Sequence, residues 1–199
     1  MIKLISSKAA SILCRDDDKE TLELYEYAIY ITLSGLFHIL TVLLLGICFN
    51  MLIESVVFYG SFILIRKFAG GYHAKTPTRC YLFSVLVSIA VLCSIRAVYA
   101  FYSIHLLVCL LFVELICALF VFLIAPLQSD NKPLDEKEIN LYKKVVRVIV
   151  SVVFAFSSVL AYLGIEIVCI PIIFGVYMCG LVLLMRKVQI YLYKNRFLH

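Results

Sequence analysis

Runs of apolar residues, most of them close to the length of a membrane span, follow one another along this chain. A transmembrane helix needs about 20 predominantly apolar residues, with about 17 as the lower limit. Six segments approach this length: 28–49, 51–65, 81–101, 104–125, 145–163 and 164–185. The second is the shortest, and it reaches the required length only by extending into the polar residues after it. We therefore expect an all-α integral membrane protein with about six transmembrane helices, built as a single membrane domain over residues 1–199.

The overall composition agrees with this expectation. Hydrophobic residues make up 64% of the chain, against about half in a typical soluble domain, and the mean hydropathy is +1.04. The first 27 residues mix charged and apolar side chains and lack the continuous apolar core of a secretory signal peptide. Most of the eight cysteines lie in apolar runs, where a thiol packs as a small apolar group. We expect a bilayer as the environment, and no structural disulfide, cofactor or nucleic-acid partner.

The basic residues predict the orientation of the chain. With six spans, all 18 Lys and Arg residues except Arg96 fall on one side of the membrane. Lys and Arg are enriched in cytoplasmic segments, so both termini, the polar loop 66–80 and the polar connection 126–144 are expected in the cytoplasm. A four-span arrangement would scatter these charges over both faces.

Residues 1–27 are expected to form an interfacial N-terminal segment. Ile2, Ile5, Ala9 and Ile12 recur at helical spacing, which favours a short amphipathic helix in the headgroup plane; the alternative is a poorly ordered tail. The aspartates at 16–18 suit the N-terminus of a following helix that begins near Lys19. In the polar connection, Glu136 and Glu138 open an interfacial helix leading into the fifth span, and a tight turn near Gly164 separates the last two.

The loop "RKFAGGYHAKTPTRCY" is the most polar and glycine-rich stretch inside the apolar region. His73 and Cys80 would lie roughly 10 Å apart on one straight helix, which is too far for direct proton transfer. Pro77 disfavours helix at the residue before it and suits the first position of a new helix. Cys80 would then lie near position N4, and Gly70 and Gly71 allow a sharp turn that folds His73 back over the helix start.

This arrangement would suit nucleophilic catalysis. A helix N-terminus, Arg79 and an imidazole all favour the thiolate form of a cysteine, with His73 as general base and later acid. Backbone N–H groups at the helix start would stabilise an oxyanion. The competing reading is a connector that happens to contain one His and one Cys. A zinc site is disfavoured, because only these two candidate ligands lie together and even a catalytic site uses three.

The loop resembles the signature of the accessory gene regulator B family, membrane cysteine endopeptidases of Gram-positive quorum sensing. The resemblance rests on Arg66, the run Gly70-Gly71-Tyr72-His73-Ala74 and Cys80, and the proline- and lysine-bearing segment "APLQSDNKPLDEKE" is similar to a second loop of the family. It implies that His73 and Cys80 are catalytic and that Arg66 and Gly71 contribute to activity.

The resemblance also implies a substrate. In that family an AgrD-like propeptide with an amphipathic N-terminal part loses its acidic C-terminal tail, and the thioester acyl-enzyme is attacked by an internal Cys or Ser to give a thiolactone or lactone. Members resemble homodimers. Arg66, Arg79 and Lys132 would attract the acidic tail, although the positive-inside rule and anionic lipids also account for such charges.

Three ionisable residues interrupt apolar runs: Glu54, Arg96 and Glu114. Such residues are usually paired or functional, so we expect Arg96 to pair with Glu54 or Glu114; a proton or ion pathway is the alternative reading. For the whole chain, the alternative to a peptidase is a small exporter or structural membrane protein.

Overall fold

The structure is a computed structural model that describes residues 2–13, 19–71, 77–127 and 135–196. The chain divides into two compact units, residues 1–44 and 45–199. The first unit holds α1 (Ile2–Leu13) and most of α2 (Lys19–Cys48). Ser6 and Ala10, one turn apart on α1, are fully buried. The predicted N-terminal helix is therefore present, as is the helix start at Lys19, while the placement of α1 in the headgroup plane stays a prediction.

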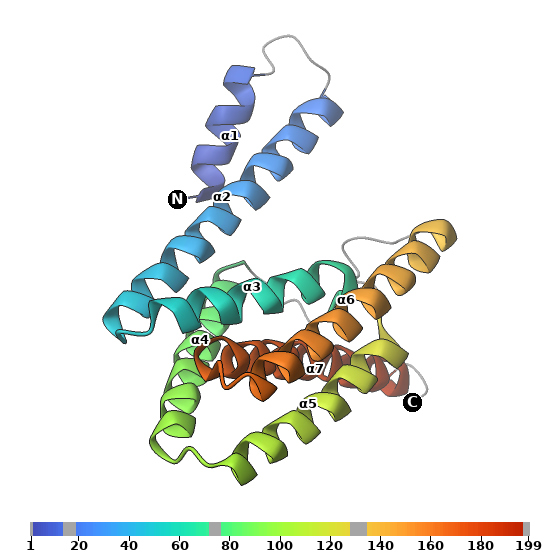
Figure 1. Cartoon of the computed structure of the whole chain (residues 1–199). Coiled ribbons are helices and arrows are strands. Elements are labelled where there is room, and N and C mark those ends of the chain that lie inside the picture. The colour runs from blue at the N-terminus through green and yellow to red at the C-terminus, as the bar shows by residue number, and fades with distance from the viewer. Residues whose placement is uncertain (1, 14–18, 72–76, 128–134, 197–199) are drawn as a thin grey trace. The chain divides into compact units, whose positions relative to one another are not determined.

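The second unit is a bundle of helices around α7 (Figure 1). Its elements are α3 (Leu52–Ala69), α4 (Pro77–Ala100), α5 (Ile104–Ile124), α6 (Glu136–Tyr162) and α7 (Glu166–Arg196). α7 contacts each of the other four. The larger of two apolar core clusters draws residues from α3, α5, α6 and α7, and includes Ile65, Val121, Val150 and Ile173. α7 is therefore the central helix of this unit.

Hydrogen bonds from α7 tie it to three neighbours. The Tyr177 hydroxyl donates to the carbonyl of Leu110 on α5 at 2.5 Å. The Cys179 thiol donates to Phe62 on α3, and the Cys169 thiol to Ser157 on α6, each at 3.3 Å. Side chains that hydrogen-bond across helices are a recognised source of helix association in membranes.

A glycine allows α7 to approach α3 closely. A Cβ atom at Gly175 would collide with the Ser61 side chain and lie 3.1 Å from the Phe62 amide nitrogen. Small residues at such crossings let two backbones come together and gain van der Waals contact. The bundle therefore depends on this position having no side chain.

The predicted all-α architecture is confirmed, and five helices are long and apolar enough to cross a membrane within the described residues: α2, α4, α5, α6 and α7. Segment 51–65 folds as part of the 18-residue helix α3, which contains Glu54 and continues through Arg66 and Lys67 to Ala69. A total of six spans stays a prediction.

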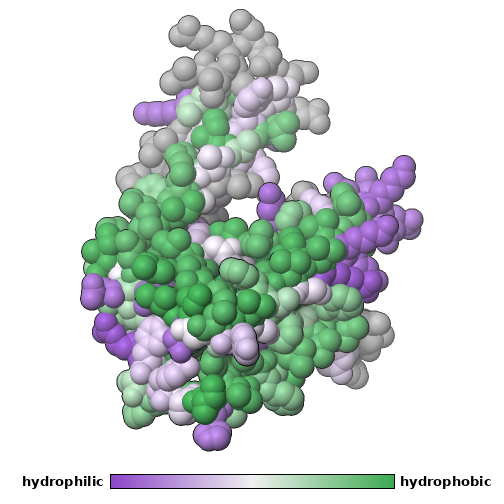
Figure 2. All heavy atoms as spheres, viewed as in Figure 1, coloured by the Kyte–Doolittle hydropathy of each residue, from purple (hydrophilic) through white to green (hydrophobic). Residues whose placement is uncertain are grey.

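Figure 2 shows hydrophobic side chains over much of the visible surface of the bundle, and hydrophilic ones gathered at the N-terminal end of α6. There, the Asp135 amide donates to the Glu138 carboxylate at 3.2 Å.

The expected ion pair of Arg96 with Glu54 or Glu114 is wrong. Arg96 Nη2 instead donates to the carbonyl oxygen of Phe49 at 2.5 Å, just beyond the end of α2. Carbonyls at a helix C-terminus lack intrahelical partners and carry partial negative charge, which suits a guanidinium. Glu114 is fully buried, and both its carboxyl oxygens lie 2.9 Å from the Ser157 hydroxyl.

Candidate active site

The end of α3 and the start of α4 carry the described residues of the predicted catalytic loop. α4 begins at Pro77, so the predicted helix start is confirmed and Cys80 lies at its fourth position. The loop is shorter than predicted, because helix α3 continues to Ala69 and places Arg66 in its last turn. His73 and Lys132 lie outside the described residues.

Gly70 ends α3 and joins it to the segment that follows α5. Its φ is +72°, a conformation that residues with a Cβ rarely adopt, and its amide donates to the Arg66 carbonyl at 3.1 Å. A Cβ here would collide with the carbonyl oxygen of Leu127, whose amide donates to Ala69 at 3.0 Å. The backbone entering the predicted catalytic loop therefore lies directly against the first residues of the polar connection.

Gly71 is buried against α7. Its φ is +131°, and a Cβ would lie 2.7 Å from Cγ1 of Val182. Val182 is itself buried. The two glycines therefore fix the start of the loop between Leu127 on one side and α7 on the other, and each is needed for both its backbone angle and its lack of a side chain.

Arg66 is half-buried, and its guanidinium lies 5.5 Å from the centre of the Phe62 ring. Cys179, Cys80 and Tyr59 lie close enough for the charge of Arg66 to act on their ionised forms. Arg66 at the end of α3 therefore lies within electrostatic range of Cys80 at the start of α4. A cation in this position stabilises negative charge that develops close to it.

Cys80 has a half-buried free thiol, and Arg79 beside it is exposed. The Cys80 carbonyl accepts a hydrogen bond from the Ser84 hydroxyl at 3.0 Å, one turn further along α4. The Cys80 side chain therefore lies on the first turn of a regular helix, where it is partly accessible.

Sequence reasoning missed the part that α7 plays at this site. Gly175, Cys179 and Val182 are spaced by four and three residues, so they share one face of the helix. That face meets Ser61, Phe62 and the Gly71 turn. The spacing of small residues in an apolar segment was the available signal.

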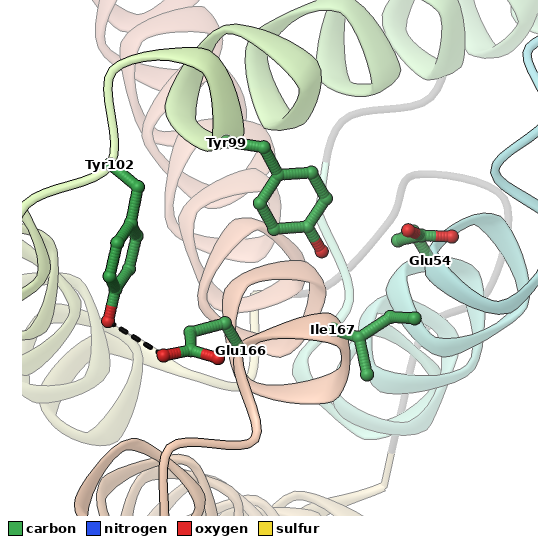
Figure 3. A pocket seen from close by; sticks show the side chains of 5 residues that line it. All are labelled: Glu54, Tyr99, Tyr102, Glu166 and Ile167. Atoms are coloured by element: carbon green, nitrogen blue, oxygen red, sulfur yellow. Dashed lines mark hydrogen bonds between the residues drawn. The ribbon is translucent and has the colours of Figure 1, made fainter.

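A second feature lies at the opposite ends of α3 and α4. Glu54 and Arg66 are twelve residues apart on α3, which corresponds to about 18 Å along the helix axis. An open pocket of about 370 Å³ lies at the Glu54 end of α3 (Figure 3). It is lined by Glu54, Tyr99, Tyr102, Glu166 and Ile167. Within the described residues, no group of three or more His, Cys, Asp or Glu side chains is arranged to hold a metal ion.

Comparison with known proteins gives a consistent result. The model of the accessory gene regulator B family matches residues 6–184. "Putative AgrB-like protein 2" of Clostridium perfringens (strain 13 / Type A) is 30% identical over 147 residues, which are 71% of this chain and 67% of that protein. "Protein FsrB" of Enterococcus faecalis (strain ATCC 47077 / OG1RF) is 31% identical over 133 residues, 65% of this chain and 52% of that protein. No solved structure matches.

Proposed function

This chain belongs to the accessory gene regulator B family, and we propose that it is a membrane cysteine endopeptidase with Cys80 as its nucleophile. Membership of the family implies involvement in the peptide processing of accessory gene regulator quorum sensing. The substrate is an AgrD-like propeptide, and the products are its acidic C-terminal tail and a cyclic thiolactone or lactone.

The observation that carries this proposal is the position of Cys80. It is a half-buried free thiol on the first turn of α4, and Arg66 lies in the last turn of α3, which leads into the same loop. The start of a helix presents backbone N–H groups that no carbonyl of the same helix accepts. Such groups, together with a cation, stabilise the oxyanion of an acyl-transfer intermediate.

The reaction takes place in two transfers. In the first, His73 takes the thiol proton, the Cys80 sulfur attacks the carbonyl before the tail, and the peptide C–N bond breaks as the same proton passes to the leaving amine. This step leaves the peptide joined to Cys80 as a thioester. In the second, a thiol or hydroxyl within the peptide attacks that thioester, and its proton returns to the Cys80 sulfur through His73. Ring closure therefore consumes no water, and exclusion of water prevents a linear product.

Two supporting roles follow from charge and backbone position. Arg66 holds the developing oxyanion, while Arg79 and Lys132 attract the acidic tail. Gly70 and Gly71 keep the loop start against Leu127 and Val182. The protein acts as a homodimer.

The test uses purified protein in liposomes with a propeptide that has an amphipathic start, a central cysteine and an acidic tail. Mass spectrometry follows tail release, cyclic product and any adduct at Cys80. Cys80→Ala and His73→Ala are expected to lose tail release, while Cys109→Ala, which removes an exposed thiol on α5, retains it. Normal processing by Cys80→Ala would contradict the peptidase proposal and favour the exporter or structural alternative.

The proposed topology has six spans, α3 included, with both termini and Cys80 on the cytoplasmic side. The turn between α4 and α5 then faces outward, and Phe101 in that turn is 79% exposed. In intact cells, a membrane-impermeant maleimide should label Phe101→Cys and leave Cys80 unlabelled. In inverted vesicles, Cys80 should become reactive. Labelling of Cys80 from outside the cell would reverse the proposed orientation.

A further inference from the structure

The pocket at the opposite end of the bundle from Cys80 is built from three helix ends and one turn. Glu54 comes from the first turn of α3 and Tyr99 from the last turn of α4. Tyr102 lies in the turn after α4, and Glu166 and Ile167 begin α7. Five residues from three helices and one turn therefore line one open space of about 370 Å³.

Glu54 is the least expected residue in this pocket. Its side chain is nine-tenths buried, with 9% of the residue exposed, and it forms no hydrogen bond with any residue that the structure describes. Its carboxylate oxygens are not among the buried side-chain atoms that lack a partner, because they face the open pocket. The carboxyl group lines the pocket (Figure 3), so a partner placed there would satisfy it.

Tyr99 presents a buried polar group that lacks a partner. Across the described residues, its hydroxyl is the one buried side-chain polar atom without a hydrogen-bond partner. The charges of Glu54 and Glu166 both act on it, and Figure 3 shows the hydroxyl pointing into the space between Glu54 and Ile167. An unpartnered buried polar group in a folded protein calls for an explanation, and a bound ligand is one of the few available.

Glu166 supplies a further hydrogen-bond acceptor at the pocket. The Tyr102 hydroxyl donates to Glu166 Oε1 at 2.8 Å, and this hydrogen bond raises the pKa of Tyr102 above its usual value, so that the phenol stays protonated. The bond uses one carboxylate oxygen. The other oxygen, Oε2, forms no hydrogen bond with a described residue and is available as an acceptor.

We propose that this pocket binds a primary ammonium group. An ammonium offers three N–H donors and one positive charge, which match the carboxylates of Glu54 and Glu166 and the hydroxyl oxygen of Tyr99. The Tyr99 ring and Ile167 supply an apolar wall for the carbon chain attached to the nitrogen. A quaternary ammonium has the charge but no N–H donor, so it cannot satisfy these three groups.

Such an ammonium has two sources, an ethanolamine lipid headgroup or a soluble amine. The pocket lies where helices α3, α4 and α7 begin or end, which is the level of lipid headgroups for helices that span a bilayer. Arg96, exposed and one turn before Tyr99 on α4, provides a cation near the pocket for the phosphate that accompanies ethanolamine in a lipid. These two observations favour the lipid source.

The test measures thermal unfolding of the purified full-length protein by circular dichroism. n-Butylammonium chloride is titrated against tetramethylammonium chloride and potassium chloride at equal ionic strength. n-Butylammonium is expected to raise the Tm in a saturable way, by about 3 °C at tenfold its Kd, and the other two cations are not. An equal rise with all three cations would overturn the proposal.

Two variants test the same residues. Tyr99→Phe removes only the unpartnered hydroxyl, so it should fold as well as the original protein and bind n-butylammonium about fivefold more weakly, as expected for one lost hydrogen bond. Glu54→Gln should abolish the Tm rise. Tyr193→Phe, at an exposed position near the far end of α7, is the matched control. Unchanged binding in Tyr99→Phe would contradict the assignment, whether or not Glu54→Gln folds.

A comparison of two lipids distinguishes an ethanolamine headgroup from a soluble amine as the source of the ammonium. The same measurement is repeated in micelles that contain phosphatidylethanolamine or phosphatidylcholine with identical acyl chains. A higher Tm with phosphatidylethanolamine, lost in Tyr99→Phe, assigns the site to the lipid headgroup. A response to n-butylammonium alone assigns it to a soluble amine, and a response to neither overturns the proposal.

Discussion

The amide of Leu127 donates a hydrogen bond to the carbonyl of Ala69 at 3.0 Å. This contact joins two segments that the sequence separates by 58 residues: the entrance of the proposed catalytic loop and the start of the polar connection. The first consequence concerns Gly70, which lies between them and has no room for a side chain.

Gly70→Ala is expected to reduce the rate of tail release by at least about tenfold. The added Cβ displaces the loop, and a rise of only about 1.4 kcal/mol in the activation free energy gives that factor. Gly164→Ala is the matched control. Gly164 has a φ of +70°, nearly that of Gly70, but an added Cβ would meet no atom within 4 Å. Both variants place alanine at a φ near +70°, so equal activity in the two would show that contact with Leu127 has no part in function. Tail release by mass spectrometry is the measurement.

Gly71→Ala should also lose activity, and Val182→Ala should restore part of it. The added methyl group would lie 2.7 Å from Cγ1 of Val182, and the second substitution removes that atom. Recovery stays partial because the φ of +131° at Gly71 remains unfavourable for alanine. The double variant is compared with both single variants for kcat and KM separately. No recovery at all would mean that backbone strain, rather than contact with α7, makes this glycine necessary.

Ser157→Ala should lower stability by about 1 kcal/mol, in the range for hydrogen bonds between membrane helices, since it leaves the buried Glu114 without its hydroxyl partner. Ser158→Ala is the control. Its hydroxyl is bonded only to the carbonyl of Phe154 on its own helix. Chemical denaturation in detergent measures both. Equal effects from the two neighbouring serines would argue against the contribution of Glu114 to the packing of α5 and α6.

Gly175→Ala is expected to destabilise the bundle, whereas Gly60→Ala should be neutral or stabilising. An added methyl group at Gly175 would collide with Ser61 on α3, while at Gly60 it would meet nothing within 4 Å. Alanine also favours the helical state by up to about 1 kcal/mol over glycine, which is the only effect left at Gly60. Tm values of the two variants in the same detergent test this, and a fall of similar size in both would contradict the close approach of α3 and α7.

Local features of the sequence predicted the helices well. Apolar runs located the long helices, Pro77 located the start of α4, and Gly164 located the turn before α7. Each of these depends on residues close together along the chain. The C-terminal boundary of α3 was less clear, because Arg66 and Lys67 are polar and nevertheless favour helix, and the helix ends only where Gly70 takes a positive φ.

Contacts between distant segments were not predictable from one sequence. Arg96 was expected to pair with a carboxylate, but its guanidinium donates to the carbonyl of Phe49. Every residue has a backbone carbonyl, so the sequence does not indicate which one will accept a hydrogen bond. Likewise, Gly71 is visible as a glycine, but its neighbour Val182 is not. The position of His73 and Lys132, which lie outside the described residues, stays a prediction.

The hydrogen bonds that hold α7 to α3, α5 and α6 come from neutral thiol and hydroxyl groups and end on backbone carbonyls. Dissolved ions screen charges on exposed groups and have little influence on such buried dipoles. The cohesion of the bundle should therefore vary little with ionic strength. A fall in processing as salt is added would then report the attraction between the basic residues and the acidic tail of the peptide, separately from any loss of folded protein.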